Sequence, residues 1–170
     1  MNPDLLGRLI DRHAPALELY ARQWCDTAED VVQEAFVKLA GQNPAPDHPA
    51  AWLFRAVRNG ALNAATASRR RRRHEAQAAA GALAWFNPNL SHELEPEQAQ
   101  AALAALPMEQ REVIVAHLWG GLTFAEIASL VESSASSIHR RYQAGIHTLR
   151  EHLGVSCPLL STRTGPTTTD

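Results

Sequence analysis

Residues 123–149 read TFAEIASLVESSASSIHRRYQAGIHTL, the pattern of two helices joined by a tight turn. Thr123, with Glu126 three residues later, predicts a capping box at the start of the first helix. In the second helix, apolar residues recur every three or four positions and form one stripe. A short capped helix, a turn and a longer helix with a basic face predict a helix-turn-helix, which sets a recognition helix into the major groove of DNA.

The second of these helices is predicted for residues 134–153 and has a polar face opposite its apolar stripe. The side chains that we assign to duplex DNA are Ser136, Ser137, His139, Arg140 and Arg141. Arginine and serine suit contacts with phosphates and base edges. A helical hairpin whose arginines are only solvated is the simpler alternative, and this pattern alone does not exclude it.

Hydrophobic periodicity near 3.6 residues continues along the chain and period-two alternation is almost absent, so the sequence predicts an all-α fold without a β-sheet. The other helices are expected at about 3–23, 27–40, 50–73, 96–105 and 109–118. Pro15 is expected to end one helix and begin another. Thr27, with Asp30 three residues later, resembles a capping box.

This pattern predicts two small helical domains joined by a flexible linker. The first covers residues 1–75 and the second residues 95–153. Between them, residues 76–94 lose the helical period, although Trp85 and Phe86 are candidates for docking. Residues 154–170 have no period and few apolar groups, so we expect a disordered tail.

The net charge of -2 conceals a strong segregation of charge along the chain. Residues 51–75 carry seven arginines and one glutamate, whereas residues 1–50 carry four basic and eight acidic side chains. On the helix predicted for 50–73, cations and amides share one face, which suits phosphates and base edges of a single strand. The residues that we assign to this face or to its ends are Trp52, Arg55, Arg58, Asn59, Asn63, Arg69 and Arg70.

Two simpler interpretations of this basic helix stay open. Trp52 and Phe54 are candidates for stacking on an unpaired base, but at least one of them is expected in the core. The run of five arginines from Arg69 to Arg73 also suits a solubilising boundary. Its continuity with the arginine and asparagine face favours the nucleic-acid interpretation.

The helix predicted for 27–40 has an exposed face of a different kind. Asp30, Gln33, Glu34 and Lys38 lie together on it. A surface of carboxylates and amides is unsuited to DNA, so it predicts either a basic protein partner or simple solvation.

Several classes of protein do not fit this sequence. With 170 residues and no long uncharged apolar stretch, the chain predicts neither a membrane span nor a signal peptide, so we expect a cytoplasmic protein. Its two cysteines and eight histidines form no metal spacing, and there is no nucleophile motif or Gly-rich phosphate loop. We therefore expect no catalytic residues, no metal and no cofactor.

Three segments taken in order resemble a known family. They are AEDVVQEAFVKLA (28–40), PAAWLFRAVRNGALNA (49–64) followed by arginines, and LPMEQREVIVAHLWGGLTFAEIASLV (106–131). In this order they resemble bacterial RNA polymerase sigma factors of the extracytoplasmic-function (ECF) subfamily. The resemblance implies a protein, monomeric when free, that binds core RNA polymerase, recognises promoter DNA and promotes strand opening; an anti-sigma factor is a further candidate partner.

The resemblance also implies a role for each surface. Asp30, Gln33 and Glu34 would lie against the clamp helices of the largest polymerase subunit. The loop at 41–50 would capture a flipped base of the minus-ten element, and the 50–73 helix would hold the non-template strand. The 134–153 helix would read the minus-thirty-five duplex, and the 76–94 segment would follow the linker path through the polymerase.

The turn and the recognition helix depart from the family pattern. Glu132 and Ser133 stand where the family usually has a glycine and an apolar residue, and the helix has His139, Ala144 and Ile146 where basic residues are common. A helix-turn-helix regulator that acts without polymerase is the main alternative, and an inactive sigma-like adaptor is another. Such a regulator would have no use for the Asp30, Gln33 and Glu34 face.

Overall fold

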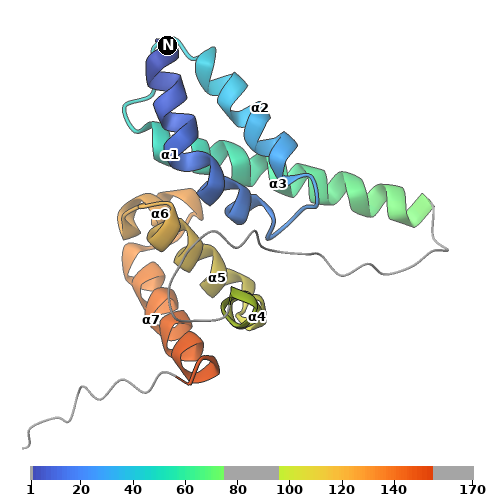
Figure 1. The fold of residues 1–170 in the computed structure, drawn as a ribbon, viewed down its shortest axis with the longest axis vertical. Helices are drawn as coiled ribbons and strands as arrows, with labels where there is room; N and C mark the ends of the chain where they lie inside the picture. Colours follow the sequence, from blue (N-terminus) through green and yellow to red (C-terminus); the bar gives the residue numbers. More distant parts are fainter. Residues whose placement is uncertain (1, 75–95, 155–170) are drawn as a thin grey trace, which may run out of the picture.

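The computed structural model describes residues 2–74 and 96–154, without the side chains of residues 72–74, 96–98 and 100. Every regular element in these ranges is helical, as the sequence predicts (Figure 1). The elements are α1 (Pro3–Ala21), α2 (Ala28–Ala40), α3 (Pro49–His74), α4 (Pro96–Ala105), α5 (Met108–Ile114), η1 (Val115–Trp119), α6 (Phe124–Leu130) and α7 (Ala135–His152). None of the described helices combines the length and the apolar character needed to cross a membrane.

The N-terminal group, α1–α3, packs each of its three helices against the other two. One apolar stripe of α2 is buried; it consists of Ala28, Val32, Ala35, Phe36 and Leu39. Pro49 opens α3, where its fixed φ and missing N–H are tolerated. The inner face of α3 is buried in this core through Leu53, Val57 and Ala61. The opposite face of the helix is left to polar side chains.

Two predictions about the first helices are wrong. Pro15 does not divide α1, which runs through it; both Pro15 and Asp11 are exposed, so water can hydrate the Asp11 carbonyl that lacks its amide donor. Thr27 precedes α2 but its side chain makes no capping hydrogen bond. Its φ of -99° and ψ of 44° lie outside the extended conformation that aims a capping hydroxyl at the helix.

The helix-turn-helix forms as predicted in α6 and α7. Thr123 Oγ1 accepts from the Glu126 amide at 3.2 Å, and the Glu126 carboxylate accepts from the Thr123 amide at 2.8 Å. The bond from the Thr123 amide and a second one from the Thr123 hydroxyl, at 2.8 Å, hold the pKa of the Glu126 carboxyl below its ordinary value. In the turn, Glu132 has a φ of 54°. That left-handed conformation favours glycine, so Glu132 adopts a strained backbone there.

A π-helical turn, η1, joins α5 to α6 and was not predicted. The Gly120 amide donates to the Val115 carbonyl at 3.1 Å, five residues back. His117 Nδ1 lies 2.7 Å from the Leu122 carbonyl, and its ring stacks on Phe124 at a centroid distance of 4.5 Å. The wider turn places Gly120 on the side of η1 that faces the N-terminal group, where it is buried.

The C-terminal group, α4–α7 with η1, packs directly on the N-terminal group. Helix α1 contacts η1, and α3 contacts α6 (Figure 1). One buried apolar cluster contains residues of both groups, among them Tyr20, Phe54, Val115 and Ile127. The predictions of a linker at 76–94 with Trp85 and Phe86, and of a tail at 154–170, concern residues outside those described, apart from Gly154 in a turn.

Candidate nucleic-acid interface

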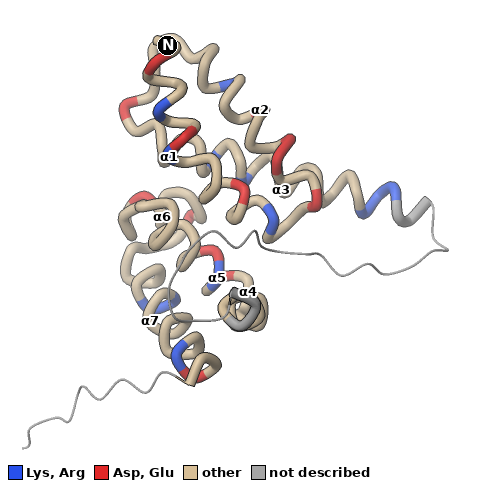
Figure 2. Tube along the Cα trace, viewed as in Figure 1, with Lys and Arg blue, Asp and Glu red and all other residues tan. Residues whose placement is uncertain are grey.

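The polar face of α3 extends along the helix as predicted. Asn59, Asn63, Arg69 and Arg70 are exposed, and the arginines gather toward the far end of the helix (Figure 2). Trp52 at the start of α3 is half-buried and packs against the apolar cluster. Phe54 is fully buried, which confirms that at least one of the two aromatic residues belongs to the core and excludes Phe54 from stacking on a base.

Arg58 does not project freely from this face. Its Nε donates to Glu112 Oε1 of α5 at 2.8 Å, and the Tyr20 hydroxyl of α1 donates to the same oxygen at 2.7 Å. The Glu112 side chain is only 8% exposed. Burial alone would lower the pKa of Arg58, but its bond to Glu112 and the charge of Glu112 raise it overall. Burial and then the Glu112 charge raise the pKa of Tyr20.

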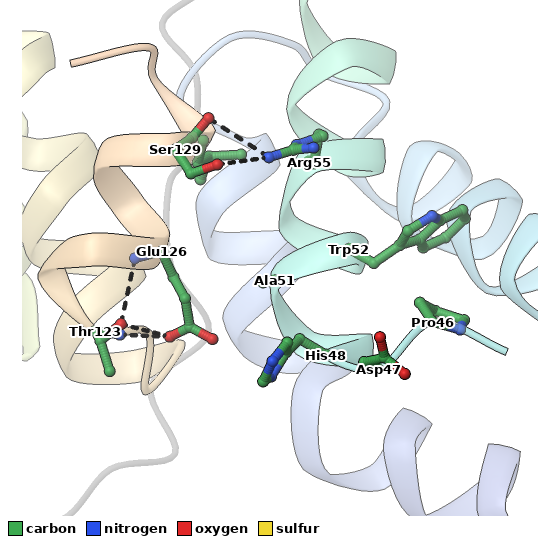
Figure 3. Close-up of a pocket in the computed structure, with 10 residues that line it drawn as sticks. Pro46, Asp47, His48, Ala51, Trp52, Arg55, Thr123, Glu126 and Ser129 are labelled. Atoms are coloured by element: carbon green, nitrogen blue, oxygen red, sulfur yellow. Dashed lines mark hydrogen bonds between the residues drawn. The ribbon is translucent and has the colours of Figure 1, made fainter.

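Arg55 is also engaged by the C-terminal group. Its Nη2 lies 3.0 Å from Ser129 Oγ and 3.5 Å from the Ser129 carbonyl of α6 (Figure 3). Two of the arginines assigned to single-stranded DNA are therefore directed at the C-terminal helices. Sequence reasoning did not foresee these contacts, because Tyr20, Glu112 and Ser129 belong to no recognisable motif.

A cavity of about 590 Å³ lies between the loop before α3 and helix α6. His48, Trp52 and Arg55 line it from the N-terminal side, and Thr123 and Glu126 from the C-terminal side (Figure 3). The loop predicted at 41–50 thus ends beside a recess lined by Trp52, whose ring points away from α6, and by Arg55 (Figure 3). These are the groups that stack on a base and neutralise a phosphate.

The residues assigned to duplex DNA lie in the first two turns of α7, on its outer face and on both flanks, since His139 and Arg141 point in nearly opposite directions. Ser136, His139 and Arg140 are exposed, while Ser137 and Arg141 are half-buried. Arg140 Nη2 donates to Ser137 Oγ at 3.2 Å, and Arg141 Nη2 pairs with Glu109 at 3.1 Å. Arg140 is therefore the more accessible of the two cations.

The face of α2 is as polar as predicted, with one apolar addition. Asp30, Gln33 and Glu34 are exposed, and Glu34 pairs with Lys38 at 2.8 Å. Val37 is 70% exposed, one turn beyond Gln33. Sequence reasoning missed Val37, although its helical spacing from Asp30 and Gln33 signals the position. A single exposed valine is ordinary on a protein surface, so both interpretations of this face, a protein partner and solvation, stay open.

The described residues hold no group of three or more His, Cys, Asp or Glu side chains suited to a metal ion. Residues 9–73 match the family model for sigma-70 region 2, and residues 96–149 match the model for sigma-70 region 4. The chain belongs to the sigma-70 family of RNA polymerase sigma factors. The α2 and α3 faces thus lie in region 2, and the helix-turn-helix lies in region 4.

Similar sigma factors are found among characterised proteins. The ECF RNA polymerase sigma factor EcfG of Rhodopseudomonas palustris is 28% identical over 148 residues, covering 83% of this chain and 78% of EcfG. The ECF RNA polymerase sigma factor SigK of Mycolicibacterium vanbaalenii is 25% identical over 135 residues, covering 77% of this chain and 69% of SigK.

Two solved structures share the fold. Sigma factor RpoE of Bartonella quintana, in complex with the anti-sigma factor NepR, has a TM-score of 0.68 at 23% identity, covering 92% of this chain and all of RpoE. CnrH, in complex with the cytosolic domain of CnrY, has a TM-score of 0.55 at 24% identity, covering 92% of each chain. The matches to sigma-70 regions 2 and 4, together with the relatives EcfG and SigK, identify this chain as an ECF sigma factor, a transcription initiation factor with a DNA-binding region.

Proposed function

We propose that this sigma factor binds core RNA polymerase through the α2 face, holds the melted minus-ten element on α3 and reads the minus-thirty-five duplex with α7. The observation that carries the proposal is that two unlike surfaces occur on adjacent helices of region 2. The α2 face combines Asp30, Gln33 and Glu34 with exposed Val37 and suits a protein. The α3 face combines arginines with Asn59 and Asn63 and suits a nucleic acid.

The proposed chemistry is binding and strand separation, without bond-making. Flipping a base out of the duplex costs roughly a few kcal/mol, because the base must be unstacked and unpaired. Contacts from Asn59, Asn63 and the recess beside Trp52 would offset that cost, and Arg69 and Arg70 would neutralise phosphates. Because RpoE of Bartonella quintana is held by an anti-sigma factor, we include such a protein among the partners proposed for this chain.

In vitro transcription tests the proposal directly. The full chain is added to purified core RNA polymerase and a pool of DNA fragments from the source genome, and the transcripts are mapped. We expect initiation at a defined set of fragments that requires the protein. Specific duplex binding without initiation would instead favour a helix-turn-helix regulator that acts without polymerase.

Arg140 provides a test of the duplex-reading helix. We expect Arg140→Ala to weaken promoter binding by the polymerase-bound sigma factor by about 5- to 100-fold, because one exposed cation is lost from the recognition face. Binding is measured by fluorescence anisotropy over a series of salt concentrations. Arg150→Ala is the matched control, because it removes the same charge from the last turn of α7. If Arg140→Ala binds the promoter no more weakly than Arg150→Ala, the outer face of α7 does not read the duplex.

A further inference from the structure

The N-terminal and C-terminal groups meet through close apolar packing. A Cβ atom added at Gly120 would lie 2.5 Å from Phe54 Cζ, so the two groups approach as closely there as a glycine allows. Phe54 in turn packs edge-on against Tyr20, with ring centroids 4.9 Å apart. The groups therefore form one packed body in this structure, although they match two separate family models.

A charged contact lies beside this apolar packing. We call Tyr20, Arg58 and Glu112 the Glu112 triad, since both donors share one Glu112 oxygen. The three residues come from α1, α3 and α5, so separating the groups would break both bonds at once. Buried ion pairs gain little net stability over water, because desolvation opposes their attraction. The triad thus fixes one arrangement of the groups, and the apolar packing beside it supplies most of the free energy that opposes opening.

The same contacts occupy the region of α3 that is proposed to hold DNA. Arg58 donates a hydrogen bond to Glu112, and Arg55 donates one to Ser129. Helix α6 also lies beside the start of α3, across the recess that Trp52 and Arg55 line (Figure 3). A single strand that followed α3 from Arg69 toward Trp52 would meet α6 and find two of its cations already paired.

We propose that this closed arrangement is a self-inhibited state, in which the Glu112 triad and Ser129 withhold Arg58 and Arg55 from single-stranded DNA. The inference rests on the proposed function of α3. A ligand that binds only the open form has its apparent affinity reduced by the fraction of chains that are open. Any change that separates the groups therefore strengthens DNA binding, and DNA in turn favours the open form.

Two variants open the triad in different ways. Tyr20→Phe removes one hydrogen bond without changing the charge or the aromatic packing of the ring. Glu112→Gln removes the charge that pairs with Arg58 and nearly keeps the shape. Asp11→Asn is the control for charge alone, because Asp11 is exposed on α1 away from the triad.

The experiment measures two quantities on the full chain. Small-angle X-ray scattering gives the radius of gyration, and anisotropy gives the affinity for a fluorescein-labelled, random-sequence single-stranded 20-mer. We expect both triad variants to expand and to bind the oligonucleotide about three- to tenfold more tightly, the range for one charge-assisted hydrogen bond partly offset by the remaining packing. The Asp11→Asn protein should match the unmodified chain in both measurements.

Each other outcome would overturn the proposal in a recognisable way. Unchanged size and affinity in both triad variants would show that the triad does not hold the groups together. If Glu112→Gln and Asp11→Asn both bind the oligonucleotide more tightly and Tyr20→Phe does not, the gain in affinity comes from net charge alone. Expansion without tighter DNA binding would contradict the masking and would count against α3 as the minus-ten surface. If Glu112→Gln fails to fold by circular dichroism, Tyr20→Phe decides.

Discussion

Replacing Asp30, Gln33 and Glu34 together by alanine is expected to reduce transcription with core RNA polymerase by at least about 100-fold. The three side chains are exposed on α2 and lie away from the α3 face. A single interface residue that contributes about 3 kcal/mol would suffice for this loss, since about 1.4 kcal/mol corresponds to a tenfold change in affinity. The measurement is transcription from a promoter found with the unmodified protein, together with direct binding to core polymerase.

The matched control for this variant is the Asp11→Ala, Arg12→Ala protein, which removes exposed charges from α1. It should transcribe like the unmodified chain. The triple variant should keep its helical content and its affinity for DNA, because its changes lie outside the DNA-binding faces. If the triple variant keeps full transcription, the α2 face is solvated surface and the polymerase must bind elsewhere.

Phe54→Ala is expected to lower the free energy of unfolding by about 3–5 kcal/mol, the usual cost of emptying a core phenylalanine site. Phe54 is fully buried and its ring contacts both Tyr20 and the surface at Gly120. Truncation would therefore leave a cavity bordered by both helical groups. Urea unfolding followed by circular dichroism measures the loss.

Phe54→Leu serves as the comparison, because it fills most of the site and should cost clearly less than alanine. A loss below about 1 kcal/mol for Phe54→Ala would mean that the site collapses or is hydrated, contrary to the packing described. Such a result would also weaken the view that the two groups share one core.

The helices were predictable from the sequence because their signals are local. The apolar stripe of α2, the proline at the start of α3 and the Thr123 capping box each depend on residues within a few positions of one another. Pro15 misled the prediction, since a proline in an exposed helix is tolerated when its orphaned carbonyl can meet water. The π turn at Val115–Trp119 has no comparable local signal.

The exposed faces of the candidate site were predictable, and the contacts of the site were not. Asn59, Asn63 and Arg140 are exposed as the helical period requires. The pairing of Arg58 with Glu112, by contrast, joins residues 54 positions apart, and that of Tyr20 with Glu112 joins residues 92 positions apart. Helical periodicity assigns a face to each residue but does not say which helix covers that face. The closed arrangement is therefore knowledge that only the structure supplies.

The Glu112 triad joins three helices of one molecule, which has a consequence for dosage. When the inhibitor is a separate chain, the fraction of sigma factor that it binds depends on how many copies of each protein the cell makes. A contact within one chain acts at an effective concentration set by the tether between its parts, and dilution does not weaken it. Doubling the synthesis of this sigma factor would double the closed and open molecules alike, leaving the ratio between them unchanged.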